Sequence, residues 1–353
     1  MPAPGSPILI DGSHGEGGGA LLRTALVMSA LTEQPLRIDG VRSGTKYPGL
    51  DYEDLLLLRA LARSTEAESV GAEVGNTQIS FLPTRRPKAL TGNLDLPEDE
   101  ALRRGASAPV VLNALLPVLA KTGMYSSVSL SGETYGHRSL GFDFFQNVTV
   151  PALQRFGLYA FPDQELAGFG RESRGRVSMD VEPSSISPVD WSARGKLVAL
   201  RAVVTTAELP STVAQRGQAH LERLAESAKL SIEVETNAVD SRSAGAFVTV
   251  WAQAERGFGG ATSMGQRGIK METLVQSAFE DVLDWVTGDA SVDPYIADQI
   301  LITACLAEGE TIFKTSRLTQ RFLTSVWVIK QFLPIHITVL GSEGEAGVVT
   351  IRR

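Results

Sequence analysis

The sequence predicts an α/β (α+β) fold in which three repeated units form a large domain and a smaller α/β domain is inserted between the second and third units. Two observations lead to this prediction. Apolar residues along the 353-residue chain follow first helical and then strand spacing, and the order helix, strand, helix, strand recurs three times. The third unit also begins about twice as far from the second as the second does from the first, so extra chain lies between them.

The elements of each unit follow from this hydrophobic periodicity. After a short strand and a run of glycines, the first unit is expected to contain helix 19–34, strand 35–41, helix 52–64 and strand 72–83. The second unit is expected to contain helix 107–123, strand 126–132, helix 142–157 and strand 175–183. The third unit is expected to contain helix 294–309, strand 311–316, helix 318–332 and strand 336–341.

The segment between the second and third units has strands and helices of its own. It is flanked by "EPSSISPVDW" and "TGDASVDP", whose Pro, Ser, Gly and Asp content is typical of connectors. The expected elements are strands 196–206, 230–237 and 246–255 and helices 211–228 and 271–288. We therefore expect a discontinuous core over 1–183 and 288–353, interrupted by an inserted α/β domain over 184–287.

Composition limits the classes of partner and location. The formal net charge is −7 and the pI is near 5.3, so no overall basic field attracts nucleic acid or an anionic membrane. An RNA partner must therefore meet a local cluster of cations, and no preference for DNA is evident. No signal peptide and no apolar run long enough to span a bilayer is seen. The single cysteine, Cys305, excludes an internal disulfide, and we expect a cytoplasmic location.

A glycine-rich loop precedes the first helix and is the first candidate binding site. Gly17, Gly18 and Gly19 let backbone N–H groups approach a bound group closely, and a helix N-terminus favours an anion. Arg23 in the first turns of that helix adds a planar cation suited to phosphate. Glu16 would repel a bare phosphate, which indicates a divalent metal bound together with a nucleotide. The alternative is a glycine turn with a purely structural role.

The loop "VRSGTKYPGL" supplies two further cations, Arg42 and Lys46. It follows the strand after the first helix, on the same side as the helix N-termini. Together with Arg23 these residues would form the local phosphate-binding cluster that the overall composition lacks. The alternative is that both are solvated surface charges.

The glycine-rich segment "DGSHGEGGGALLRTAL" followed by "RSGTKYPGL" resembles the signature of the RNA 3′-terminal phosphate cyclase family. Further motifs in family order are "GASAPVVLNALLPVLA", "FGGATSMGQRG", "YIADQILI" and "VIKQFLP". The resemblance implies three βαβαββ-type units, an architecture shared with enolpyruvyl transferases, and an inserted α/β domain. It also implies a reaction in which ATP and Mg²⁺ or Mn²⁺ convert an RNA 3′-phosphate into a 2′,3′-cyclic phosphate through an adenylylated histidine.

The resemblance carries several site residues over by position. Glu16 matches the glutamate that contacts metal and ATP, and Arg23 and Arg42 match arginines that contact phosphates. The positions that line the nucleotide site match Tyr295, Asp298 and Gln299. A loop of the inserted domain matches Gly265, Arg267 and Gly268.

Other family positions have changed. The nucleophilic histidine lies eleven residues before the phenylalanine of "FLP", and counting back from Phe332 gives Arg321. An arginine cannot act as the nucleophile, because its guanidinium stays protonated and its lone pair is delocalised. The family's Gln-His pair after "PGL" is replaced by Glu53 and Asp54, which add negative charge. Its Asn-Pro in the second unit is replaced by Gly136 and His137.

Two of the four histidines are candidates for a substitute nucleophile. His14 lies in the glycine-rich loop and His137 in the corresponding loop of the second unit. His220 on an amphipathic helix and His336 on a strand are expected at the surface. No Cys/His cluster indicates zinc, and no G-x-S-x-G motif indicates a serine hydrolase.

Three functions stay open. The first is a divergent cyclase-like protein that binds RNA 3′ ends or phosphates, or a protein partner, without the adenylylation step. The second is an active ATP-dependent RNA 3′-phosphate cyclase that uses a displaced nucleophile or none. The third is another small-molecule enzyme on the enolpyruvyl transferase architecture, a hypothesis that rests on fold alone. A homodimer is also compatible with the sequence.

Overall fold

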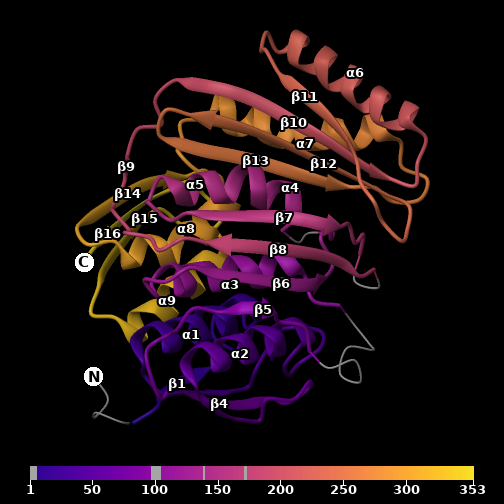
Figure 1. Ribbon diagram of the computed structural model, residues 1–353. Coiled ribbons are helices and arrows are strands. Elements are labelled where there is room, and N and C mark those ends of the chain that lie inside the picture. The colour runs from indigo at the N-terminus through magenta and orange to yellow at the C-terminus, as the bar shows by residue number, and fades with distance from the viewer. Residues whose placement is uncertain (1–5, 97–104, 138–139, 171–172) are drawn as a thin grey trace.

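The computed structural model describes residues 6–96, 105–137, 140–170 and 173–353. These residues form four sheets of four strands each, joined by helices (Figure 1). Three of the sheets share one strand order. In each, the first two strands in the chain pair in parallel, and the fourth strand pairs antiparallel between the second and the third. The described residues therefore confirm the mixed α/β fold class and a βαβαββ repeat.

The first sheet has the order β1-β2-β4-β3. Its strands are β1 (Ile8–Asp11), β2 (Leu36–Asp39), β3 (Glu68–Val70) and β4 (Gln78–Leu82). The connecting helices are α1 (Gly19–Thr32) and α2 (Tyr52–Thr65). Both predicted helices are confirmed within two residues at their ends. The strand expected over 72–83 is confirmed as the shorter β4, and β3, which pairs antiparallel with it, was not predicted.

The second sheet repeats this order as β5-β6-β8-β7. Its strands are β5 (Thr91–Asn93), β6 (Ser126–Gly132), β7 (Ala160–Leu166) and β8 (Gly175–Val181). Its helices are α3 (Ala108–Ala120) and a run of α4 (Phe142–Phe144), a π-helical turn η1 (Phe145–Thr149) and α5 (Val150–Gln154). The strands β5 and β7 were not predicted.

The third sheet has the order β15-β16-β14-β9. Its strands are β9 (Asp190–Trp191), β14 (Glu310–Thr315), β15 (His336–Leu340) and β16 (Gly347–Arg352). Its helices are α8 (Pro294–Leu306) and α9 (Gln320–Phe332). Because β9 pairs in parallel with β14, it is the first strand of this unit. We therefore propose that the inserted domain begins after β9, later than the expected start at residue 184.

The fourth sheet, with the order β11-β10-β12-β13, lies at the top of Figure 1. Its strands are β10 (Leu197–Ala207), β11 (Glu233–Ala238), β12 (Gly245–Ala254) and β13 (Gly257–Met264). Its helices are α6 (Ser211–Ser227) and α7 (Met271–Thr287), which pack on the sheet over an apolar cluster of their own that includes Leu221, Val248 and Val275. Separate packing of this kind supports the proposal of an inserted domain.

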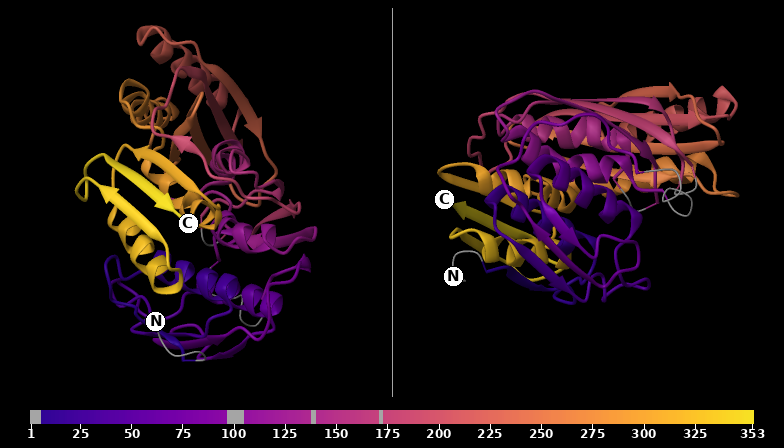
Figure 2. Two further views of the ribbon diagram at one scale, coloured as in Figure 1. Left: turned by 90° about the vertical axis from the view of Figure 1, so that its left-hand side faces the viewer. Right: turned by 60° about the horizontal axis from the view of Figure 1, so that its bottom comes forward.

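The helices of the three repeated units pack against one another in the middle of the molecule (Figure 2). Helix α1 contacts α2, α3 and α9, and its central residues Ala25 to Met28 are fully buried. The loops that precede α1, α2 and α4 line a common cavity, to which they contribute Glu16, Arg42 and Glu133. No helix among the described residues is long and apolar enough to cross a membrane.

A buried carboxylate links the second unit to the fourth sheet. Asp143 Oδ1 accepts a hydrogen bond of 2.8 Å from the Tyr135 hydroxyl, and Oδ2 accepts one of 2.7 Å from the hydroxyl of Thr205 on β10. Burial raises the pKa of Asp143 to about 6, although both hydrogen bonds lower it. The Asp143 carboxyl group therefore keeps its proton to a higher pH in the folded protein than in the unfolded chain.

Asp143 should make stability depend on pH in the mildly acidic range. The pKa of Asp143 in the folded protein exceeds its value of about 4 in the unfolded chain, so its proton contributes up to roughly 3 kcal/mol to the free energy of unfolding. This contribution is full below pH 4 and is lost as the pH rises through about 6. Urea unfolding of the wild type and of Asp143→Asn at several pH values measures this contribution to the free energy of unfolding. The free-energy difference between the two proteins should fall as pH rises from 4 to 7. A constant difference would contradict the assignment.

Candidate functional site

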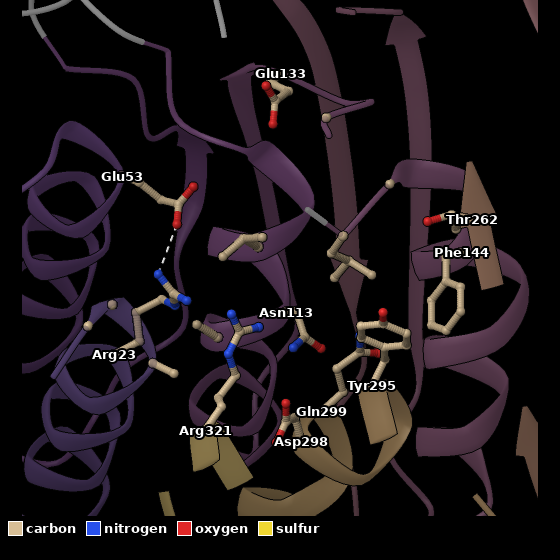
Figure 3. Close-up of a pocket in the computed structure, with 18 of the residues that line it drawn as sticks. Arg23, Glu53, Asn113, Glu133, Phe144, Thr262, Tyr295, Asp298, Gln299 and Arg321 are labelled. Atoms are coloured by element: carbon tan, nitrogen blue, oxygen red, sulfur yellow. Dashed lines mark hydrogen bonds and ion pairs between the residues drawn. The ribbon is translucent and has the colours of Figure 1, made fainter. Parts of the chain in front are cut away.

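A cavity of about 840 Å³ lies where the three units and the fourth sheet meet (Figure 3). Every unit contributes to its lining, with Gly19 from α1, Asn113 from α3, Thr262 from β13 and Tyr295 from α8. Its volume lies in the range of sites that hold small ligands and cofactors. The glycine-rich loop and the residues expected to line the nucleotide site are thus brought together.

The glycine-rich loop closes on the loop that follows β2. Gly17 has a φ of +54°, and a Cβ atom there would lie 3.0 Å from the backbone of Gly44. The loop directs Glu16 onto the start of α1, where its Oε1 accepts hydrogen bonds from the backbone N–H groups of Ala20 (2.8 Å) and Leu21 (3.2 Å). The helix N-terminus that was expected to bind an anion is therefore already bound to a carboxylate of the chain.

The side chains of Arg23 and Arg42 both lie against Gly19. Each is paired with a carboxylate of α2. Arg23 Nη1 lies 2.9 Å from Glu53 Oε1, and Arg42 Nη1 lies 2.8 Å from Asp54 Oδ2. A Cβ atom on Gly19 would lie 2.7 Å from the Arg23 guanidinium and 3.2 Å from that of Arg42. The glycine at this position therefore makes room for both side chains.

Asp54 is fully buried and is the centre of this cluster. It belongs to the capping box of α2, where its Oδ2 accepts a hydrogen bond of 3.3 Å from the backbone N–H of Asp51. Its Oδ1 lies 3.5 Å from Arg23 Nη1. The two arginines expected to contact phosphates line the cavity, but their charge is balanced by the chain's own acidic residues.

Arg321 is the least enclosed of the three arginines in the described cavity lining. It lies in the first turn of α9, and its side chain is 52% exposed, against 18% for Arg23 and 17% for Arg42. Its Nε lies 3.9 Å from Glu16 Oε2. Figure 3 shows the Arg321 guanidinium pointing towards Asn113.

Helix α8 supplies the three residues expected to line the nucleotide site, and all three line the cavity. Burial raises the pKa of Asp298 to about 7, while the nearby Arg321 lowers it. Gln299 Oε1 accepts a hydrogen bond from the Thr149 hydroxyl. Tyr295 is half-exposed and meets Phe144 edge to face, with 6.5 Å between ring centroids.

Other predicted residues lie apart from the cavity lining. His14 is exposed and stacks on Trp327, with 3.8 Å between ring centroids. Lys46 is exposed, and its Nζ lies 5.4 Å from the Tyr47 ring centroid. His137 does line the cavity, and its Nδ1 lies 3.4 Å from Gln266 Nε2. The described lining includes Thr262, Ser263 and Met264 but not Gly265, Arg267 or Gly268.

Sequence reasoning did not single out Asn113, Glu133 or Thr262, which all line the cavity. Asn113 is the one polar residue within the apolar helix run "PVVLNALLPVLA", and that was the available signal. Glu133 and Thr262 lie in or next to strands and carry no comparable signal. Their place at the site depends on how the units pack.

A sequence profile described as RNA 3′-terminal phosphate cyclase matches residues 14–339. The chain belongs to the RNA 3′-terminal phosphate cyclase family. A protein of that name from Methylococcus capsulatus (strain ATCC 33009 / NCIMB 11132 / Bath) is 31% identical over 97% of this chain and 95% of its own length. Another from Thermococcus gammatolerans (strain DSM 15229 / JCM 11827 / EJ3) is 33% identical over 98% of this chain and 97% of its own.

A solved structure, the enolpyruvyl transferase NikO from Streptomyces tendae, covers 97% of this chain and 47% of that chain at 12% identity and a TM-score of 0.39.

Within this cyclase-family chain, the described residues do not form a resident metal site. They contain no group of three or more His, Cys, Asp or Glu side chains that could hold a metal ion. At Glu16, the expected metal ligand, one carboxylate oxygen accepts two backbone N–H groups and the other faces Arg321. A cation at Glu16 would therefore have to compete with a guanidinium.

Proposed function

We propose that this member of the cyclase family binds RNA 3′ ends in the cavity and lacks the adenylylation step that the family resemblance implies. The observation that carries the proposal is the position of Arg321. Its half-exposed side chain lines the cavity, and the family resemblance assigns the nucleophile to this sequence position. A guanidinium cannot attack ATP, but it donates up to five hydrogen bonds and suits phosphate oxygens.

The charges around the cavity also support binding without nucleotide chemistry. Arg23 and Arg42 are paired with Glu53 and Asp54, so they do little to offset a triphosphate. ATP and Mg²⁺ or Mn²⁺ belong to the family reaction and would be needed by an active enzyme. The carboxylates of Glu53 and Asp54 are bonded to these arginines, so neither is free to hold the metal.

An active ATP-dependent cyclase is the second candidate, and one observation favours it. Of the four histidines, all within the described residues, His137 is the one that lines the cavity, so it is the available substitute nucleophile. No observation favours a different small-molecule enzyme. A cytoplasmic location and a homodimer or protein partner stay predictions from the sequence.

Competition between linear and circular RNA tests the proposed function. A fluorescent single-stranded RNA is bound to the protein at low salt, where phosphate contacts are strongest, and unlabelled competitors are added. Linear RNA should compete at least about tenfold better than a circular RNA of the same sequence, because a circle offers no end to the cavity. Equal competition would contradict end binding.

A further inference from the structure

The outer face of the second sheet, which crosses the middle of Figure 1, carries three exposed aromatic side chains. Tyr125 is 47%, Tyr159 47% and Phe161 54% exposed. Strand β8 pairs with both β6 and β7, and the register puts Ser127, Asp180 and Phe161 in one row across the three strands. Tyr125 and Tyr159 lie two residues before Ser127 and Phe161. Alternate residues of a strand share a face, so all three rings lie on the side away from the helices.

Carboxylates lie beside these rings. A hydrogen bond with Asp180 raises the pKa of the Tyr125 hydroxyl, which places the Asp180 carboxyl group next to that ring. Glu182 follows β8, and its backbone N–H donates a hydrogen bond of 3.0 Å to the carbonyl oxygen of Tyr159. Asp163 is exposed two residues after Phe161 on β7. We call these six residues the aromatic-acidic patch: Tyr125, Tyr159, Phe161, Asp163, Asp180 and Glu182.

The charge of the aromatic-acidic patch is not balanced by the sheet that carries it. Arg176 is the one lysine or arginine in the four described strands of this sheet. Its Nε lies 3.1 Å from Glu165 Oε2 and its Nη1 lies 3.7 Å from Asp95 Oδ2, and both of these carboxylates lie outside the patch. The patch therefore presents negative charge together with aromatic rings.

The two other repeated sheets show that the fold does not require these exposed rings. In their described strands the phenylalanine and tryptophan residues are Phe81, Phe313 and Trp191, and all three are buried. The outward faces of these sheets therefore carry no phenylalanine, tyrosine or tryptophan. Clustered exposed aromatic side chains are typical of surfaces that bind a partner.

We propose that the aromatic-acidic patch binds an arginine-rich segment of another protein. A guanidinium stacks on aromatic rings and forms paired hydrogen bonds with carboxylates, and the patch offers both groups. RNA would bring its phosphates against these carboxylates, and a second copy of the chain would bring the same carboxylates together. The patch residues are not part of the described cavity lining, so this interaction does not depend on the proposed RNA binding.

Two fluorescent peptides of equal length and charge test the proposal with the full chain. One alternates arginine with serine, and the other has lysine in place of each arginine. Binding is followed by anisotropy at physiological salt, where weak attraction between exposed charges is screened. The arginine peptide should bind at least about fivefold tighter, because arginine combines stacking on a ring with paired hydrogen bonds to a carboxylate. Equal binding would show attraction to the net charge of −7 alone and would overturn the proposal.

Two variants, each with a matched control, assign the binding to the patch. Phe161→Ser and Glu182→Gln should each weaken binding of the arginine peptide about threefold or more. Leu340→Ser removes a side chain that is 63% exposed on the third sheet, and Glu68→Gln removes an exposed charge from the first sheet. Each control should change the affinity less than about twofold.

The outcomes separate an arginine-rich partner from the other occupants. If neither patch variant weakens binding more than its control does, the peptide binds elsewhere and the proposal is wrong. If Phe161→Ser instead weakens binding of single-stranded RNA, or dissociates a dimer of the chain, the patch takes RNA or a second copy, and the proposal is also wrong. Urea unfolding checks that each variant is folded. Because Glu182 is exposed and lies after the end of β8, its variant carries the test if Phe161→Ser is destabilised.

Discussion

Replacing Asp54 with alanine is expected to lower the free energy of unfolding by about 3–5 kcal/mol, because it removes one partner from a buried charge cluster. Asp54 is fully buried, lies 2.8 Å from Arg42 and 3.5 Å from Arg23, and closes the capping box of α2. The substitution leaves Arg42, itself only 17% exposed, without its shortest ion pair. Urea unfolding at neutral pH measures the change.

Asp39→Ala is the matched control for that measurement. Asp39 also pairs with an arginine, Arg37, at 3.1 Å, but both side chains are about half exposed. An exposed pair of this kind contributes roughly 0–1 kcal/mol. If Asp54→Ala destabilises the protein no more than Asp39→Ala, the cluster is not the structural element described here, and Arg23 and Arg42 are more available to a ligand than we propose.

Replacing Arg321 with alanine is expected to weaken binding of RNA 3′ ends by about 10- to 100-fold. Hydrogen bonds to charged groups contribute about 1.5–3 kcal/mol, which corresponds to that range. Arg321 is the half-exposed arginine of the described cavity lining, and Arg23 and Arg42 cannot readily replace it because α2 holds both. Fluorescence anisotropy with a labelled RNA at fixed low salt measures the change.

Two further variants interpret the Arg321 result. Arg321→Lys keeps the positive charge but loses the planar donor fork, so it should retain part of the affinity. Arg317→Ala removes an exposed arginine just before α9 and should change affinity less than twofold, as expected for a rim charge outside the site. Equal losses in Arg321→Ala and Arg317→Ala would show that binding depends on overall charge and not on the cavity.

Much of the fold could be predicted from the sequence because its signal is local. Helices α1, α2, α3, α8 and α9 follow periodic apolar runs, and they begin or end within a few residues of the predicted positions. Two of the strands that were missed lack such a signal. Strand β7 lies at a sheet edge and contains Pro162 followed by three successive polar residues, and β9 has only two residues.

Strand β13 was missed for a different reason. Its segment "GFGGATSM" has three glycines and therefore a low strand propensity. In the structure the glycines are needed because large groups pack against them: a Cβ atom would lie 2.3 Å from Trp285 at Gly259 and 2.8 Å from Phe144 at Gly260. Tertiary contacts of this kind leave no periodic pattern in the segment itself.

The site could be predicted only in outline. The sequence placed Glu16, Arg23 and Arg42 near one another, and its reading of Glu53 and Asp54 as added negative charge agrees with their position. It could not show that these acids pair directly with the two arginines, because that depends on how α2 packs beside α1. The contributions of Asn113 and Glu133 likewise depend on packing between units.

The most direct test of the central claim is the intact mass of the purified protein after incubation with ATP and Mg²⁺ or Mn²⁺. The same sample is then given an RNA with a 3′-phosphate, and the RNA product is analysed. We predict an unchanged protein mass and an unchanged RNA end, from a preparation that binds linear RNA. A protein heavier by one adenylyl group, or conversion of the RNA to a 2′,3′-cyclic phosphate over repeated turnovers, would contradict the account.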